Sequence, residues 1–126
     1  MRHYEDITKF RINTLPQRAY YIPENKGAKT DLNGTWNFNF YEREEEADLN
    51  AKVWNKITVP SCWQHQGFEK PNYTNVNYPF PVDPPYVPDM NPCGVYNTSF
   101  FIDGEWENRE TYIVFEGVCS CIYLYI

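Results

Sequence analysis

The sequence has no long apolar run, few basic residues and no cluster of them. Its 126 residues contain 11 Lys and Arg against 17 Asp and Glu, which gives a formal charge of −6. Without a basic groove the chain is a poor partner for nucleic acid. No apolar run approaches the roughly 20 residues that span a membrane, and no apolar signal region follows the polar N-terminus. We therefore expect a cytoplasmic protein that contacts neither nucleic acid nor membrane.

Cysteine pairs and zinc-binding patterns are also missing. The four cysteines are Cys62, Cys93, Cys119 and Cys121. Because they form no CxxC pair, we expect neither a disulfide nor a metal site in this chain. The sequence predicts reduced thiols that pack as small apolar groups.

Signatures of catalytic chemistry are absent as well. There is no P-loop, no GxGxxG and no HExxH motif. Cys62 lies three residues before His65, but the surrounding residues match no signature of a catalytic cysteine. Glu116 interrupts an apolar run, yet nothing in the sequence pairs two carboxylates across a scissile bond. We expect no catalytic residue here.

Aromatic residues, in contrast, are abundant and make up 18% of the chain. Such side chains fit β-sheets, and they also stack on sugars and bases. Trp36, Phe38 and Phe40 alternate with polar residues directly after a turn at residues 31–34. This pattern predicts a half-buried strand over residues 35–41. The length leaves room for one domain, which we expect to be all-β.

Further strands are predicted on both sides of a proline-rich segment. They are expected at residues 54–59, 94–102, 111–118 and 122–126. The acidic residues 42–49 predict a short surface helix or a solvated loop.

The ends of the chain differ in character. Residues 1–30 show no clean period, which predicts an irregular arm, and the domain is expected over residues 31–126. The alternating pattern is still present at Ile126. We therefore expect a domain that is truncated at this point.

Residues 60–92 hold eight of the ten prolines. Since proline cannot donate to a sheet ladder, this segment is expected to be a long ordered loop. Ordered loops of this length are usually functional. The amides of Asn75 and Asn77 suit sugar hydroxyls, because each both donates and accepts hydrogen bonds. The alternative is that both amides bond only to their own loop backbone.

Several motifs, in the same order, resemble the large bacterial β-galactosidases of glycoside hydrolase family 2. The resemblance covers about residues 11–126. The motifs are residues 31–36 with Phe38 and Phe40, residues 59–64 with Gly67, residues 73–79, 91–92, 94–96 and 115–118.

The resemblance implies a jelly-roll, galactose-binding-like β-sandwich at the N-terminus of a larger enzyme. In that family a TIM barrel supplies two catalytic glutamates, with magnesium and sodium nearby, and hydrolyses terminal β-D-galactosides such as lactose with retention. The first domain contributes a loop whose Asn touches galactose. By resemblance, Asn75 with Val76 beside it is the expected substrate-binding pair. The family's additional galactose-binding aspartate follows residue 126, so the sugar site is expected to be incomplete.

Three hypotheses follow for this chain. The first is a non-catalytic, sugar-binding fragment of a β-galactosidase, whose partners are the remaining domains of a homo-oligomeric enzyme. The second is a carbohydrate-binding module that binds galactosides unaided. The third is a structural or complementing fragment, in which residues 1–30 pack on a partner chain.

Overall fold

The computed structural model describes residues 2–16 and 29–126. The chain divides into two compact units, one formed by residues 30–100 and one by residues 1–29 with 101–126. Residues 101–126 thus group with the N-terminal segment, although the sequence predicts a domain over 31–126 and an arm over 1–30. Residues 17–28 of the predicted arm lie outside the described residues. The division into arm and domain stays a prediction.

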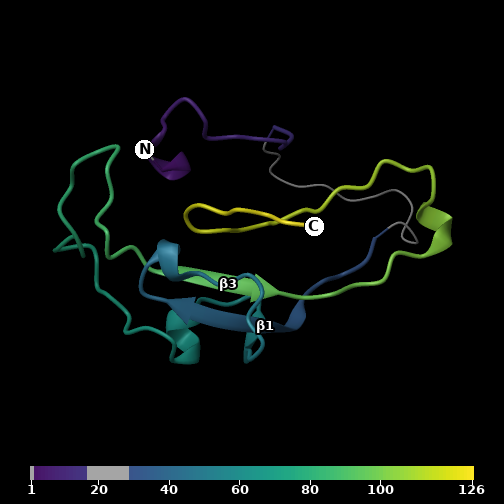
Figure 1. The fold of residues 1–126 in the computed structure, drawn as a ribbon, viewed down its shortest axis with the longest axis horizontal. Helices are drawn as coiled ribbons and strands as arrows, with labels where there is room; N and C mark the ends of the chain where they lie inside the picture. The colour runs from purple at the N-terminus through teal and green to yellow at the C-terminus, as the bar shows by residue number, and fades with distance from the viewer. Residues whose placement is uncertain (1, 17–28) are drawn as a thin grey trace. The chain divides into compact units, whose positions relative to one another are not determined.

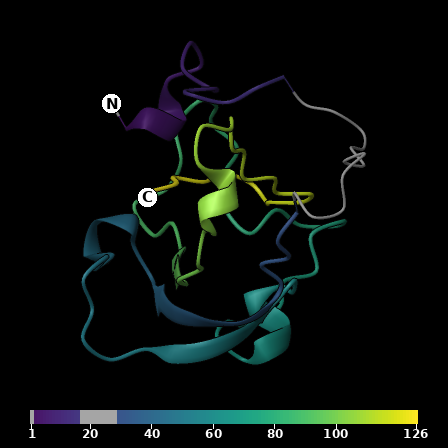
Figure 2. The same cartoon turned by 90° about the vertical axis from the view of Figure 1, so that its right-hand side faces the viewer.

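The unit of residues 30–100 is built on a three-stranded antiparallel sheet (Figure 1). Strand β1 (Gly34–Tyr41) lies between β2 (Asn55–Val59) and β3 (Cys93–Asn97). Figure 2 shows the same strands from a second direction. Within the described residues there is no α-helix. The expected all-β class is therefore confirmed, while the jelly-roll sandwich stays a prediction.

A local turn starts β1, as the sequence predicts. The backbone N–H of Asn33 donates to Asp31 Oδ1 at 2.9 Å, and the indole Nε1 of Trp36 donates to the carbonyl oxygen of Leu32 at 2.7 Å. Gly34 has φ +139°, a conformation that side chains rarely adopt. These short-range interactions fix where the strand begins.

The two faces of β1 differ in chemistry. Phe38 is completely buried, and so is Ile57 of β2, which pairs with Trp36 on the same face. Val95 of β3 is also buried, but it pairs with Asn39 and so lies on the opposite face. On the other face Asn37 lies opposite both Lys56 and Asn97. Asn37 Nδ2 donates to Asn97 Oδ1 at 3.1 Å, and Lys56 Nζ donates to Asn37 Oδ1 at 2.5 Å. Alternation along β1 thus separates an aromatic core from a polar row.

Short 3₁₀ turns complete the regular structure. They are η1 (His3–Glu5), η3 (Glu44–Glu46), η4 (Trp63–Gln66) and η5 (Gly104–Trp106). The predicted acidic surface segment is thus a loop that includes η3. No helix of the described part is long or apolar enough to cross a membrane.

Two of the predicted strands are wrong and a third is too long. Residues 111–118 and 122–126 have no strand structure, and β3 ends at Asn97 instead of continuing to residue 102. Figure 1 shows the C-terminal residues as a narrow loop that doubles back. A strand is stabilised by hydrogen bonds to a neighbour, and none of the described residues pairs with these segments. Alternation of apolar side chains does not supply that partner.

The cysteine prediction holds only in part. All four cysteines are free, as expected. Cys62, Cys119 and Cys121 are exposed, however, so the prediction that they pack as apolar groups is wrong for these three. They lie outside the strands, where little packs over them. Cys93 in β3 is half-buried.

Candidate functional site: the loop of residues 70–92

Directly before residue 70, the carboxylate of Glu69 binds two side chains of η4. Oε2 of Glu69 accepts hydrogen bonds from Trp63 Nε1 at 2.6 Å and from Gln64 Nε2 at 2.7 Å. Gly67, with φ +84°, ends η4 and lets the chain turn back so that Glu69 reaches these donors. Bonds to a charged acceptor are stronger than neutral ones, so this arrangement fixes the start of the loop.

Both ends of the loop pack on Phe38. The Phe38 ring contacts Phe68 at 4.6 Å and Tyr96 at 4.7 Å between ring centroids, and Trp63 at 6.2 Å. Phe68 precedes the loop, whereas Tyr96 follows it in β3. Burial raises the pKa of Tyr96, with a smaller contribution from Cys62. The aromatic cluster thus holds the two ends of the loop against the same buried ring.

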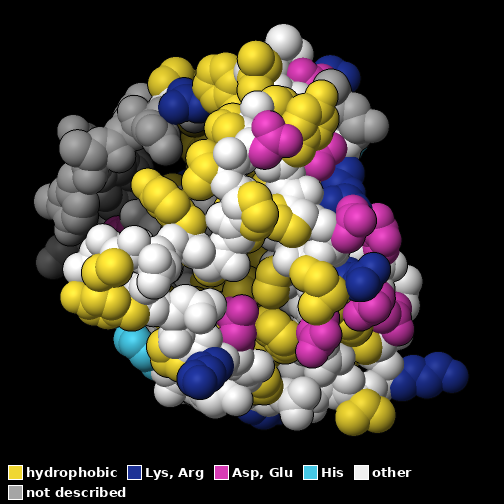
Figure 3. Space-filling view, turned by 90° about the vertical axis from the view of Figure 1, so that its left-hand side faces the viewer, with side chains coloured by type: hydrophobic (Ala, Val, Ile, Leu, Met, Phe, Trp, Pro, Cys, Tyr) yellow, Lys and Arg dark blue, Asp and Glu magenta, His cyan; other side chains and the backbone are white. Residues whose placement is uncertain are grey.

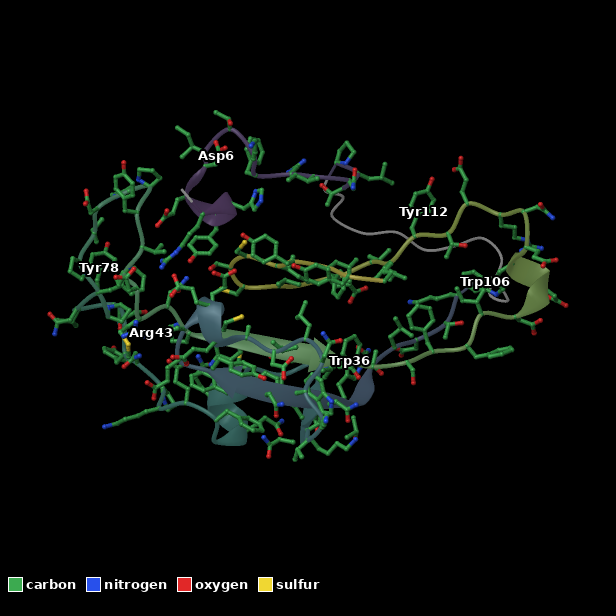
Figure 4. The ribbon with its side chains drawn as sticks, in the orientation of Figure 1. Asp6, Trp36, Arg43, Tyr78, Trp106 and Tyr112 are labelled. Atoms are coloured by element: carbon green, nitrogen blue, oxygen red, sulfur yellow. The ribbon has the colours of Figure 1, made fainter. Side chains whose placement is uncertain are left out.

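The loop predicted over residues 60–92 contains no strand of the sheet (Figure 1). Its first part includes η4, and residues 70–92 form the longer remaining part. The loop contains two short ordered features, a turn at residues 74–76 and an isolated β-bridge between Asp83 and Tyr86. At the bridge, the Tyr86 N–H donates to the Asp83 carbonyl oxygen at 2.8 Å. The loop projects past one end of the sheet, and Figure 4 shows Tyr78 on it. The prediction of a long loop here is confirmed.

The loop exposes large side chains to solvent. Tyr73 and Val76 are each 77% exposed, and Tyr78 is 75% exposed. Figure 3, viewed from the side on which the loop lies in Figure 1, shows hydrophobic side chains at the surface among acidic and other polar ones. Aromatic groups that lie open to solvent are available for contact with a ligand or another domain.

Asn75 is exposed at the turn, and its amide is already held by a neighbour. Asn75 Nδ2 donates to the phenol oxygen of Tyr73 at 2.9 Å. Within residues 2–16 and 29–126, Asn75 Oδ1 has no hydrogen-bond partner. The alternative expects Asn75 and Asn77 to bond only the backbone of their own loop; the partner of Asn75 is a side chain of that loop. The role of Asn75 in sugar binding stays a prediction. The turn places Val76 beside Asn75, also in solvent.

The other candidates do not assemble into a site. Cys62 and His65 meet only through their backbones, where His65 N–H donates to the Cys62 carbonyl oxygen at 3.1 Å in the first turn of η4. Glu116 is exposed. Burial raises the pKa of the Cys93 thiol, and the Glu44 carboxylate adds to that effect. A raised pKa makes this thiol a weaker nucleophile.

Magnesium and sodium, which the resemblance implies for the larger enzyme, find no matching donor set here. In the part of the chain that the structure describes, no group of three or more His, Cys, Asp or Glu side chains could hold a metal ion. Magnesium and sodium stay expectations for the larger enzyme.

Two contacts of the site were not predicted from the sequence. Glu69 stands five and six residues after its two donors, a spacing that matches no helical or strand period. Tyr73 and Asn75 are two residues apart, so the sequence could have indicated that they lie close together. The hydrogen bond between them is seen only in the structure.

Comparison with known proteins finds relatives that match most of the chain. The chain is 34% identical to the β-galactosidase of Actinobacillus pleuropneumoniae and 36% identical to that of Staphylococcus xylosus, over 98% of its length in both cases. It is 44% identical to the β-galactosidase of Leuconostoc mesenteroides over 82% of its length.

The relatives are much longer than this chain. The matched stretch spans only 14% of the first two proteins and 11% of the third. Residues 29–126, which include the whole sheet and the loop, match the family described as "Glycosyl hydrolases family 2, sugar binding domain". The chain belongs to the sugar-binding domain family of the family 2 glycosyl hydrolases.

Proposed function

We propose that this chain is the sugar-binding segment of a β-galactosidase that hydrolyses terminal β-D-galactosides. Its loop of residues 70–92 carries Asn75 and Val76 to the galactose, which the rest of the enzyme holds. The chain itself performs no bond cleavage. The acid and the nucleophile, each a carboxylate, come from the remaining domains, which are its partners.

The observation that carries this proposal is that the two ends of the loop are anchored to the sheet while the turn that bears Asn75 is exposed to solvent. The loop ends pack on Phe38 and are held by Glu69, whereas Asn75 is exposed, and among residues 2–16 and 29–126 nothing donates a hydrogen bond to its side-chain oxygen. A polar group presented by a well-anchored loop loses less entropy on binding than a freely moving one. The relatives are named β-galactosidases, and this name supports galactose as the sugar that the loop contacts.

Further properties of the complete enzyme belong to the same proposal. These are a jelly-roll fold for the domain, a homo-oligomeric assembly, a cytoplasmic location, and magnesium and sodium held by other domains. The match covers only 14% and 11% of two relatives, which supports the proposal that this stretch supplies one part of the sugar site and other domains supply the rest.

A chimera tests the proposal. Residues 29–126 replace the matching stretch of the Leuconostoc mesenteroides β-galactosidase, and hydrolysis of a chromogenic β-galactoside is measured. We expect an active chimera in which Asn75→Ala lowers kcat/KM about tenfold, through loss of a hydrogen bond to substrate. Asn72→Ala is the matched control, since Asn72 is exposed in the same loop and is no candidate for the sugar, and we expect it to leave kcat/KM within about twofold.

Two results would contradict the proposal. One is a chimera that folds, by circular dichroism and gel filtration, yet does not hydrolyse the galactoside. The other is an active chimera in which Asn75→Ala and Asn72→Ala have the same kcat/KM as the parent chimera.

A further inference from the structure

We propose that Tyr73 is a positioning residue that orients the Asn75 amide, so that the sugar meets the amide oxygen and the phenol hydroxyl together. This inference rests on the proposed function and deepens it. It assigns a role to Tyr73, which has no part in the sequence-based prediction of Asn75 and Val76, and it predicts which hydrogen-bonding group the sugar must offer.

The geometry defines the direction of the hydrogen bond. Asn75 Nδ2 lies 2.9 Å from Tyr73 Oη, across the turn at residues 74–76. An exposed Asn side chain otherwise samples several rotamers, and ordering it on binding costs free energy. The Tyr73 ring, with two side-chain torsions, is a comparatively rigid support for the amide. The amide is therefore ordered before the sugar arrives.

An inventory of donors and acceptors shows what remains for a ligand. The Asn75 NH₂ group uses one of its two hydrogens on Tyr73 Oη, which accepts. Asn75 Oδ1 remains an acceptor, and the second Nδ2 hydrogen of Asn75 and the phenol hydrogen of Tyr73 remain donors. An acceptor beside a donor complements two neighbouring hydroxyls of a pyranose, one of which donates while the other accepts. The hydroxyl that faces Asn75 Oδ1 must donate, because that oxygen only accepts.

Tyr78 provides an internal comparison. It lies in the same loop and is as exposed as Tyr73, at 75% against 77%. In the described part of the chain its hydroxyl makes no hydrogen bond, so it orients no neighbouring side chain. Tyr78→Phe thus removes a hydroxyl from the loop without disturbing Asn75, and is the matched control for Tyr73→Phe.

The first arm of the test uses the chimera and a double-mutant cycle. We expect Tyr73→Phe to raise KM about three- to tenfold, with a smaller effect on kcat, because the unsupported amide is ordered only on binding. Tyr78→Phe leaves both constants within about twofold. In the Asn75→Ala background, Tyr73→Phe has less than half of its effect on KM, because its main role is to hold Asn75.

The second arm reads the orientation of the amide directly. Inhibition constants are measured for a thiogalactoside, its monodeoxy derivatives and its monodeoxyfluoro derivatives at each hydroxyl. Fluorine accepts weakly and cannot donate. At the hydroxyl that faces Asn75 Oδ1, the deoxy and fluoro derivatives lose the same affinity relative to the parent, and Asn75→Ala abolishes that loss. Tyr73→Phe should weaken this pattern and Tyr78→Phe should leave it unchanged, whereas a merely structural role of Tyr73 would leave it unchanged in both.

The outcomes separate the two proposals. If Asn75→Ala lowers kcat/KM but Tyr73→Phe behaves like Tyr78→Phe, the positioning role is wrong and the proposed function stands. If the fluoro derivative keeps the affinity that the deoxy derivative loses, the amide NH₂ faces the sugar and the positioning role is also wrong. If Asn75→Ala itself has no effect, the proposed function fails first.

Discussion

Gly94 of β3 lies so close to Phe38 of β1 that a Cβ at position 94 would come within 2.7 Å of the Phe38 atom Cε2. The same Cβ would come within 2.9 Å of two ring atoms of Trp63. Gly94 follows the loop and Trp63 precedes it, so the missing side chain allows both ends of the loop to approach Phe38.

Gly94→Ala is therefore expected to destabilise the chain by about 1–3 kcal/mol, because rigid aromatic rings must shift to admit the methyl group. The free energy of unfolding is measured from urea denaturation followed by tryptophan fluorescence. Gly104→Ala is the control, since no atom lies within 4 Å of a Cβ at that position. Equal denaturation midpoints for the two variants would contradict the packing described here.

Glu69→Gln tests the carboxylate at the start of the loop. The amide oxygen keeps an acceptor for Trp63 or Gln64 but loses the charge, so we expect a loss of about 1 kcal/mol. Limited proteolysis should also cut residues 70–92 faster in this variant. Glu105→Gln, at an exposed position, should change neither quantity. A Glu69→Gln chain as resistant to cleavage as its parent would show that the carboxylate does not hold the loop.

The cysteines should differ in reactivity. Burial raises the pKa of the Cys93 thiol, which leaves less thiolate at a given pH, and the side chain is also less accessible than the other three. In a pulse of iodoacetamide at pH 8, mass spectrometry should find Cys93 alkylated last and exposed Cys62 well before it. Raising the pH should speed labelling of Cys93. Labelling of Cys93 as fast as Cys62 would contradict its burial in β3.

The contribution of Asp6 to the stability of the fold depends on pH, and its lowered pKa fixes the direction of that dependence. The Thr8 hydroxyl, and then the Thr8 backbone N–H, hold the pKa of the Asp6 carboxyl below its ordinary value of 3.8. A lowered folded-state pKa stabilises the fold above pH 3.8, and that stabilisation is lost as the pH falls through the folded-state pKa. Thr8→Ala should raise the Asp6 pKa, measured by carboxyl carbon chemical shift, while Thr8→Ser should restore it. A titration midpoint that is unchanged in Thr8→Ala would rule out the hydroxyl as the cause.

What the sequence predicts well is local. The turn at residues 31–34 and the alternation of Trp36, Phe38 and Phe40 define β1, because short-range bonds and one buried face suffice to form it. The prolines of residues 60–92 exclude a central strand in the same direct way.

What the sequence does not predict depends on partners distant along the chain. Residues 111–118 are an apolar run that predicts a strand, yet no described residue offers them a ladder, and they form no strand. The site is similar: the motif singles out Asn75, but the bond to Tyr73 and the attachment of the loop through Glu69 depend on side-chain geometry. Pattern alone carries no information about that geometry.

The most direct measurement is a crystal structure of the chimera with a bound, non-hydrolysable thiogalactoside. The account predicts that Asn75 Oδ1 lies about 2.6–3.2 Å from a galactose hydroxyl, with the Asn75–Tyr73 hydrogen bond intact. A galactoside that occupies the catalytic pocket while Asn75 points elsewhere, with no atom of residues 70–92 in contact with the sugar, would contradict it.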